Sequence, residues 1–254
     1  MSQKFIEIDK IFKLAFENGL IFTKHPIAIA DGKNISVYDG DQIKDYKLVK
    51  ESEFPFEMPP MVQASFTLEF YDNKSAAVLG KDVFSTTEDF ITILHEFVHC
   101  YQWETCELDI KEQLKIYDHY KSKKDGMWEL NHSFPYENEK IIALFEKYFN
   151  ELSYQNIENA MKYKKEIADN LSDVDYEYMV WQEWKEGYAR FIENRILELM
   201  NMTLIKGYSK LQGRVSFYDS GALNFDILLK DGKGSKDLKG LFKKIGMTSP
   251  TPHP

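Results

Sequence analysis

The chain has 254 residues, of which 43% are hydrophobic and 15% aromatic, and this composition excludes an intrinsically disordered protein. Its formal net charge is −9 and no cluster of basic residues stands out, so neither nucleic acid nor an anionic membrane is expected as a partner. There is no apolar signal core and no apolar run of membrane-spanning length, which favours a cytoplasmic protein.

The first 84 residues predict a lobe of mixed helix and strand. Helical spacing from Phe5 to Asn18 ends at Gly19, a residue that commonly follows a helix. Beyond it, strand-like segments alternate with turn residues such as Asp31-Gly32-Lys33-Asn34 and Asp72-Asn73. Two hairpins of short strands are therefore expected, at 27–30 with 35–38 and at 65–71 with 76–79.

The next predicted helix carries the most informative motif of the chain. Ser85-Thr86-Thr87-Glu88 predicts a capping box that starts this helix, and His95-Glu96-Phe97-Val98-His99 within it has the pattern HExxH. Residues four apart share one helix face, so His95 and His99 can direct imidazole nitrogens at one metal ion, with Glu96 beside them. Two neutral histidines and a carboxylate suit zinc, whose bound water loses its proton near neutral pH.

Three neighbours of this motif have more than one interpretation. Gln102 lies one turn after His99 and either supports that histidine or is exposed. Cys100 points away from the histidine face, and its distance from Cys106, about 9 Å along a helix, is too long for a disulfide. Free thiols fit a reducing cytoplasm. Without a metal, the motif would be a buried amphipathic helix with two hydrogen-bonded histidines.

A helical insert is predicted between the motif and the next candidate ligand. Helical patterns cover about 107–123 and 136–168, with a break from Gly126 to Pro135. Such an insert would either narrow access to a cleft or bind a protein partner, and both functions stay open. The break holds Glu129 and His132, which with Glu96 and His99 match the ligand spacing of a di-iron bundle, but it is a poor place for a bundle helix.

A third zinc ligand is expected from the long helix predicted over 173–202. Gly187 is costly inside a helix, and together with Ala189 it indicates close approach to another backbone. Glu186 precedes this small surface and is our candidate ligand. The alternative is a solvated face that Glu186 shares with Glu183, Arg190 and Glu193.

Here the chain resembles the gluzincins, the thermolysin-like zinc metallopeptidases, in which HExxH is followed by a helix with Glu-Gly-x-Ala. The resemblance covers roughly 84–230 and implies that His95, His99 and Glu186 bind zinc and that Glu96 is the general base. Arg190 stands where thermolysin has an Asp, so the residue that orients a histidine is unassigned. In this family an edge strand of the sheet pairs with the substrate backbone, a role for 65–71 or 76–79.

Tyr218 adds a candidate oxyanion donor. Tyr218-Asp219-Ser220-Gly221-Ala222 resembles the Tyr-x-x-Gly-Ala segment of zinc aminopeptidases, where the tyrosine hydroxyl donates to the oxyanion. Tyr188 and Tyr208 are the other candidates. The Gly-x-Met-Glu-Asn motif that binds a substrate's free amine is missing, so exopeptidase action is not supported.

Together these features predict an α+β protein with a small antiparallel sheet lobe over 1–84, a helical catalytic lobe over 85–248 and a disordered tail over 249–254, whose His253 is not a ligand candidate. The predicted function is a zinc-dependent metallopeptidase with one Zn²⁺ per chain and a peptide or protein substrate. The alternative is a catalytically silent zinc-site protein that binds a partner through its helical insert. The intact Glu96 favours the enzyme.

Overall fold

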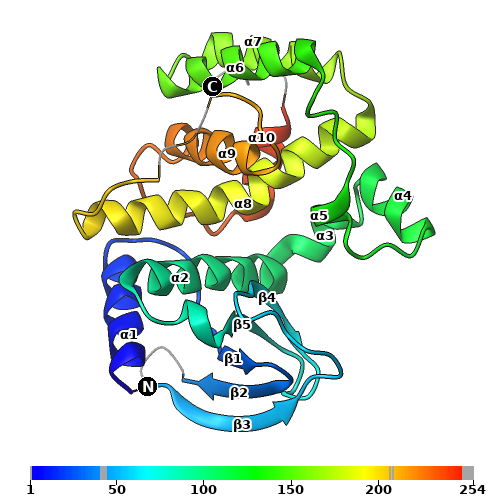
Figure 1. Ribbon diagram of the computed structural model, residues 1–254. Coiled ribbons are helices and arrows are strands. Elements are labelled where there is room, and N and C mark those ends of the chain that lie inside the picture. The colour runs from blue at the N-terminus through cyan, green and yellow to red at the C-terminus, as the bar shows by residue number, and fades with distance from the viewer. Residues whose placement is uncertain (1, 41–44, 206, 208, 248–254) are drawn as a thin grey trace. The chain divides into compact units, whose positions relative to one another are not determined.

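The computed structural model of the protein describes residues 2–40, 45–205, 207 and 209–247. The fold is α+β, with a five-stranded mixed sheet and a mainly helical remainder (Figure 1). The chain divides into two compact units, one of Met1–Thr105, Ile192–Leu204 and Lys233–Lys236 and the other of Cys106–Phe191, Ile205–Gly232 and Asp237–Pro254. The predicted boundary at 84/85 differs from this division, because the helix with the HExxH motif belongs to the unit that contains the sheet. The predicted tail over 249–254 lies outside the described residues.

The sheet has the strand order β3-β2-β1-β5-β4. Both predicted hairpins are confirmed as the antiparallel pairs β1–β2 and β4–β5, but β1 and β5 run parallel, so the expectation of a wholly antiparallel sheet was wrong for this pair. β3 and β4 are the edge strands, which leaves β4, and not β5, as the candidate edge from the second hairpin. The strands are β1 Ile27–Asp31, β2 Asn34–Asp39, β3 Lys47–Glu53, β4 Gln63–Leu68 and β5 Lys74–Gly80.

The hairpin turns follow from residues that tolerate a left-handed backbone. Gly32 has φ +63°, and the turn between β4 and β5 holds Asp72 at 50° and Asn73 at 53°. Asp and Asn adopt this region more readily than other residues with a Cβ, because their short side chains bond to the local backbone. The same argument explains the end of the first helix, since Gly19 has φ +81°.

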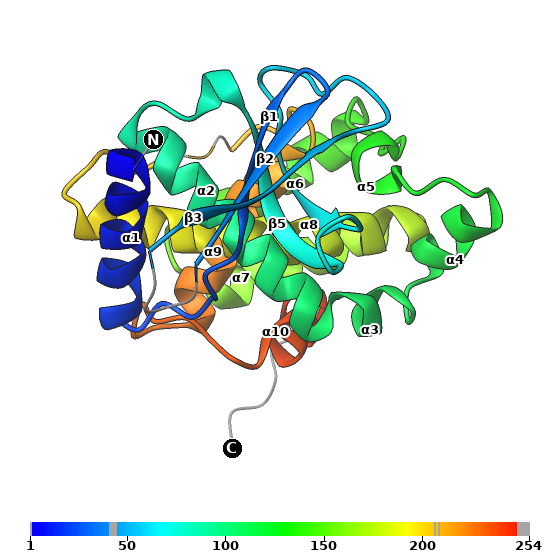
Figure 2. The same ribbon diagram turned by 90° about the horizontal axis from the view of Figure 1, so that it is seen from below.

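Two helices complete the core of the first unit, α1 (Ser2–Glu17) and α2 (Thr87–Gln102). α2 packs on β4, β5 and α1, as Figures 1 and 2 show. Its N-cap is Thr86, whose hydroxyl accepts from the backbone N–H of Asp89 while Asp89 accepts from Thr86, so the capping box lies one residue later than predicted. A 3₁₀ turn, Lys81–Val83, precedes the helix and a π-helical turn, Trp103–Glu107, follows it.

The second unit is helical, and the predicted insert forms part of its core. α6 and α7 lie side by side, and α6 also packs on α9 (Figure 1). No described helix is both long and apolar enough to cross a membrane. The remaining helices are α3 Leu108–Lys111, α4 Lys115–Ser122, α5 Trp128–Asn131, α6 Glu139–Ser153, α7 Ile157–Ala168, α8 Asp173–Leu199, α9 Val215–Leu228 and α10 Leu238–Gly246, and α8 continues from the second unit into the first at Ile192.

Helices α8 and α9 meet at two glycines. A Cβ added to Gly187 would lie 2.5 Å from the Cα of Gly221, and one added to Gly221 would lie 2.1 Å from the backbone oxygen of Glu183. Neither position has space for a side chain, because the obstructing atoms are backbone. The predicted close approach of Gly187 to another backbone is therefore confirmed, and the partner is α9.

A buried polar network joins this helix crossing to the insert. Glu183 on α8 is fully buried and accepts from Lys164 Nζ at 2.6 Å, Tyr148 OH at 2.9 Å and Ser220 Oγ at 2.8 Å. Asn224 donates to Tyr148 OH at 2.6 Å. Buried charges require such compensation. Tyr148 on α6 and Lys164 on α7 thus make the insert an internal part of the unit.

Candidate metal centre

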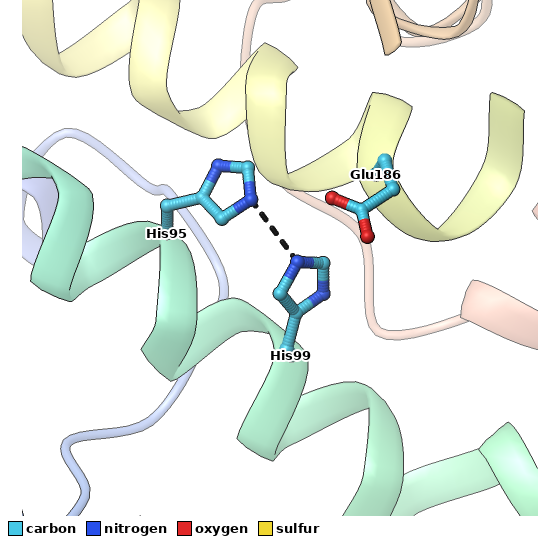
Figure 3. A group of neighbouring side chains, drawn as sticks. All are labelled: His95, His99 and Glu186. Atoms are coloured by element: carbon cyan, nitrogen blue, oxygen red, sulfur yellow. Dashed lines mark hydrogen bonds between the residues drawn. The ribbon is translucent and has the colours of Figure 1, made fainter. Parts of the chain in front are cut away.

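Helix α2 places two imidazole rings against each other. His95 and His99 stand one turn apart, and their Nε2 atoms are separated by 3.0 Å (Figure 3). In a tetrahedral zinc site with Zn–N bonds of about 2.0–2.1 Å, two ligand nitrogens lie about 3.3 Å apart. The spacing of the two rings is therefore close to what one zinc ion requires.

The other nitrogen of each ring faces an oxygen. His99 Nδ1 lies 2.9 Å from Gln102 Oε1, and His95 Nδ1 lies 3.4 Å from a carboxylate oxygen of Glu193 on α8. The four side chains are largely buried, with His95 11% exposed and the other three 10% or less. Outer partners of this kind orient metal-binding histidines and fix their tautomers.

These contacts favour one tautomer of each ring. Gln102 Oε1 only accepts, so His99 Nδ1 carries the proton that it donates, and the Glu193 carboxylate favours a proton on His95 Nδ1 in the same way. In two neutral rings both Nε2 atoms would then present lone pairs to each other across 3.0 Å. A proton on one Nε2 atom makes an ordinary hydrogen bond at this distance, and a metal ion bound by both atoms would take the same place.

Glu186 belongs to the same group of side chains. Among the described residues, His95, His99 and Glu186 form a group in which one ligand atom from each lies within 4.8 Å of the others (Figure 3). Two imidazoles and one carboxylate are the donor set of a catalytic zinc site with an open fourth position. The residues present therefore fit the ion that the sequence predicts.

Glu96 is buried beside these histidines on α2 and is 7% exposed. Much of the remaining helix surface is apolar and packs into the core of the first unit; the buried apolar residues are Phe90, Ile91, Ile93, Leu94, Phe97 and Val98. A buried carboxylate next to two polar rings is costly unless the group has a chemical or structural partner.

The three tyrosine candidates lie in different surroundings. Tyr218 is on α9 and 8% exposed, with the Arg214 guanidinium carbon 5.6 Å from the centre of its ring. Tyr188 is fully buried, and its ring contacts Phe225 edge-on at 5.1 Å, which favours a packing role. Tyr208 lies outside the described residues. Tyr218 remains our candidate donor.

The roles of the two residues that contact the histidine Nδ1 atoms were not clear from sequence patterns. These patterns allowed Gln102 to be either a partner of His99 or an exposed residue, although its position three residues after His99 puts both on one helix face. Glu193 was grouped with a solvated face, yet it contacts His95 and is 8% exposed. That solvated-face interpretation is wrong for Glu183 as well, since Glu183 is fully buried against Lys164.

The second Glu-x-x-His segment does not form a metal site in the described part of the chain. Glu129 pairs with Lys111 at 2.6 Å and with Lys185 at 2.8 Å. His132 bonds to Tyr120 and Asp175, each at 2.8 Å. Two ammonium groups at one carboxylate repel a divalent cation, which argues against the di-iron interpretation.

The two cysteines are free, as predicted, and both are buried. Neither belongs to the metal-binding group found among the described residues. Comparisons of the chain with protein-family models, with curated proteins and with solved structures give no match. The function is therefore inferred from the residues and their geometry.

Proposed function

We propose that the protein is a zinc-dependent metallopeptidase in which His95, His99 and Glu186 hold the ion. The observation that carries the proposal is the histidine pair, with Nε2 atoms 3.0 Å apart and each Nδ1 facing a fixed oxygen. Outer oxygens of this kind orient the rings of metal-binding histidines and favour the tautomer that leaves Nε2 free for the ion.

The geometry of α8 supports Glu186 as the third ligand. Glu193 contacts His95, and Glu186 precedes it by seven positions. Seven residues are two helical turns less about 20°, so both carboxylates lie on the same face of α8. Glu183, the neighbouring alternative, is occupied by Lys164 and Ser220.

Each residue then has a defined chemical task. Zinc bound by His95, His99 and Glu186 would supply a Lewis acid for polarising a scissile carbonyl and for acidifying a water molecule. Glu96 takes the proton of the attacking water and transfers it to the leaving amine. The Tyr218 hydroxyl donates to the oxyanion that develops on the carbonyl. β4, an edge strand of the sheet, is the candidate for pairing with the backbone of an extended peptide or protein substrate.

The decisive experiment is Glu96→Gln, which preserves shape and removes the proton acceptor. Zinc content and melting temperature should stay at wild-type values, while cleavage of a peptide library falls on the order of 100-fold or more. Glu88→Gln is the matched control, because Glu88 is exposed in the first turn of the same helix. Equal cleavage by Glu96→Gln and wild type would refute the mechanism.

Zinc analysis separates the alternatives. Purified protein should hold about one zinc per chain, and His99→Ala should lose most of it. Glu186→Gln should weaken zinc binding, with the exposed Glu198→Gln on α8 as its control. Zinc bound without any cleavage by wild type would instead indicate a silent zinc-site protein. Full zinc occupancy in a His95→Ala/His99→Ala double variant would exclude this site.

We also propose that the protein works in the cytoplasm. The support is the pair of buried free thiols, Cys100 and Cys106, since a reducing compartment keeps thiols in this state. Fluorescence microscopy of the tagged protein in its host would test this location.

A further inference from the structure

Arg214 is a cation for which the described part of the chain supplies no acidic partner. The chain has three arginines, and one of the others, Arg195, pairs with Glu198 at 2.6 Å. Arg214 is half-buried at the N-cap of α9, and no carboxylate of the described residues forms an ion pair with it. This is unexpected in a chain with 41 acidic and 32 basic residues.

The guanidinium of Arg214 lies beside the candidate oxyanion donor. Its carbon is 5.6 Å from the centre of the Tyr218 ring, in cation–π range. Tyr218 follows Arg214 by four positions, one turn of helix, so the two side chains share a face of α9. A group bound by Arg214 would therefore be close to the Tyr218 side chain.

Within the second unit, Arg214 and Glu186 both act on the pKa of the same tyrosine, Tyr178. Burial raises the pKa of Tyr178, and the Arg214 charge opposes this rise while the Glu186 charge adds to it. Burial and Tyr178 raise the pKa of Tyr136, which Arg214 again opposes. Both phenols thus lie within the field of the guanidinium, and Tyr178 also lies within that of Glu186.

We infer that Arg214 binds a carboxylate of the substrate, so that the peptidase prefers acidic peptides. This inference rests on the proposed function and names its substrate class. A guanidinium presents a fork of N–H donors that matches a carboxylate, and such charge-assisted pairs are stronger than neutral hydrogen bonds. The carboxylate is either an Asp or Glu side chain or the C-terminus of the peptide.

Because the chain has a negative net charge, a preference for acidic peptides would require a positive group at the binding site. At −9 the protein repels an acidic peptide at a distance, and at physiological salt this repulsion is screened beyond about 8 Å. A preference for acidic substrates must therefore come from a cation at the site itself. Arg214 is the arginine beside Tyr218.

The test uses the full-length zinc protein and matched peptides. Each peptide is prepared with Asp or Glu, with Asn or Gln in their place, and with a free or an amidated C-terminus, which separates the two sources of carboxylate. Wild type should cleave one acidic form with a kcat/KM at least tenfold above its neutral match, mainly through a lower KM. Arg214→Gln should abolish this difference, so that its kcat/KM is equal for the acidic and the neutral form of each peptide, while Arg214→Lys should restore part of the difference.

Arg195→Gln removes the same charge elsewhere and should keep the preference. Binding of the acidic and neutral peptides to Glu96→Gln, measured by fluorescence anisotropy, gives a second readout that needs no turnover. Equal cleavage and equal binding of acidic and neutral peptides by wild type would overturn the inference while leaving the peptidase intact. Arg214-dependent binding of acidic peptides without cleavage would keep the inference and refute the peptidase.

Discussion

Glu193 should control zinc affinity although it is not a ligand. Its carboxylate lies 3.4 Å from His95 Nδ1, and the two side chains are 10% and 11% exposed, so solvent screens the contact weakly. The charge holds the proton on Nδ1 and thereby leaves Nε2 free to bind a metal. Loss of such an outer partner typically reduces metal affinity 10- to 100-fold, or roughly 1.4–2.7 kcal/mol.

Two substitutions of Glu193 are expected to give losses of zinc affinity at the lower and the upper end of this range. Glu193→Gln keeps an oxygen that accepts from Nδ1 but removes the charge, so we expect zinc affinity to fall about tenfold; Glu193→Ala removes the acceptor and should approach a 100-fold loss. Glu198→Gln is the control, because this residue lies on the same helix with its side chain 57% exposed.

Competition with a chromophoric zinc chelator at fixed pH measures the affinities, and circular dichroism of the metal-free proteins checks the fold. A fully folded Glu193→Ala protein that binds zinc as tightly as wild type would refute this role of Glu193. An equal loss of zinc affinity in Glu198→Gln would refute it as well, since a general charge effect would then explain both variants.

Three further predictions concern other parts of the molecule. Tyr218→Phe should lower kcat on the order of 100-fold at unchanged zinc content, and steady-state kinetics showing a wild-type kcat would dismiss Tyr218 as the donor. Gly187→Ala should lower the melting temperature, because the new Cβ would lie 2.5 Å from the Cα of Gly221; Ala189→Gly serves as a reference for backbone flexibility. Burial opposes ionisation of Glu129, but Lys185 and Lys111 outweigh it and lower its pKa to about 2. The stability that this carboxylate supplies is complete above its unfolded pKa, about 4.3, and is lost as the pH falls from there towards 2, so acid titrations of wild type and Glu129→Gln should converge in that window.

Local patterns predicted the elements that depend on local physics. The HExxH helix, both hairpins and the long helix α8 follow from apolar spacing and turn residues, and Gly187 signalled a close helix crossing. β3 was missed because its side chains are almost all exposed, so Lys47–Glu53 has no buried face and no apolar alternation. The parallel pairing of β1 with β5 joins distant segments and has no local signature.

The roles of the acidic residues on α8 could not be predicted from the helical sequence pattern. Glu183, Glu186 and Glu193 look alike in a helical pattern, and nothing local separates a buried ion pair from a ligand or from a histidine anchor. Lys164 decides the role of Glu183, and His95 decides that of Glu193. Each partner comes from another helix, so only tertiary structure separates these carboxylates.

The burial of Lys164 determines whether the helical insert can be removed from this protein. An insertion that packs only on the surface of a domain can be deleted to obtain a smaller protein. The sequence pattern of residues 107–168 is that of such an insertion. Excision would remove Lys164 and Tyr148 and leave the Glu183 carboxylate without its counter-charge, a loss of about 3–5 kcal/mol for a buried pair. A miniaturised version would therefore need a neutral residue at position 183 before it could fold.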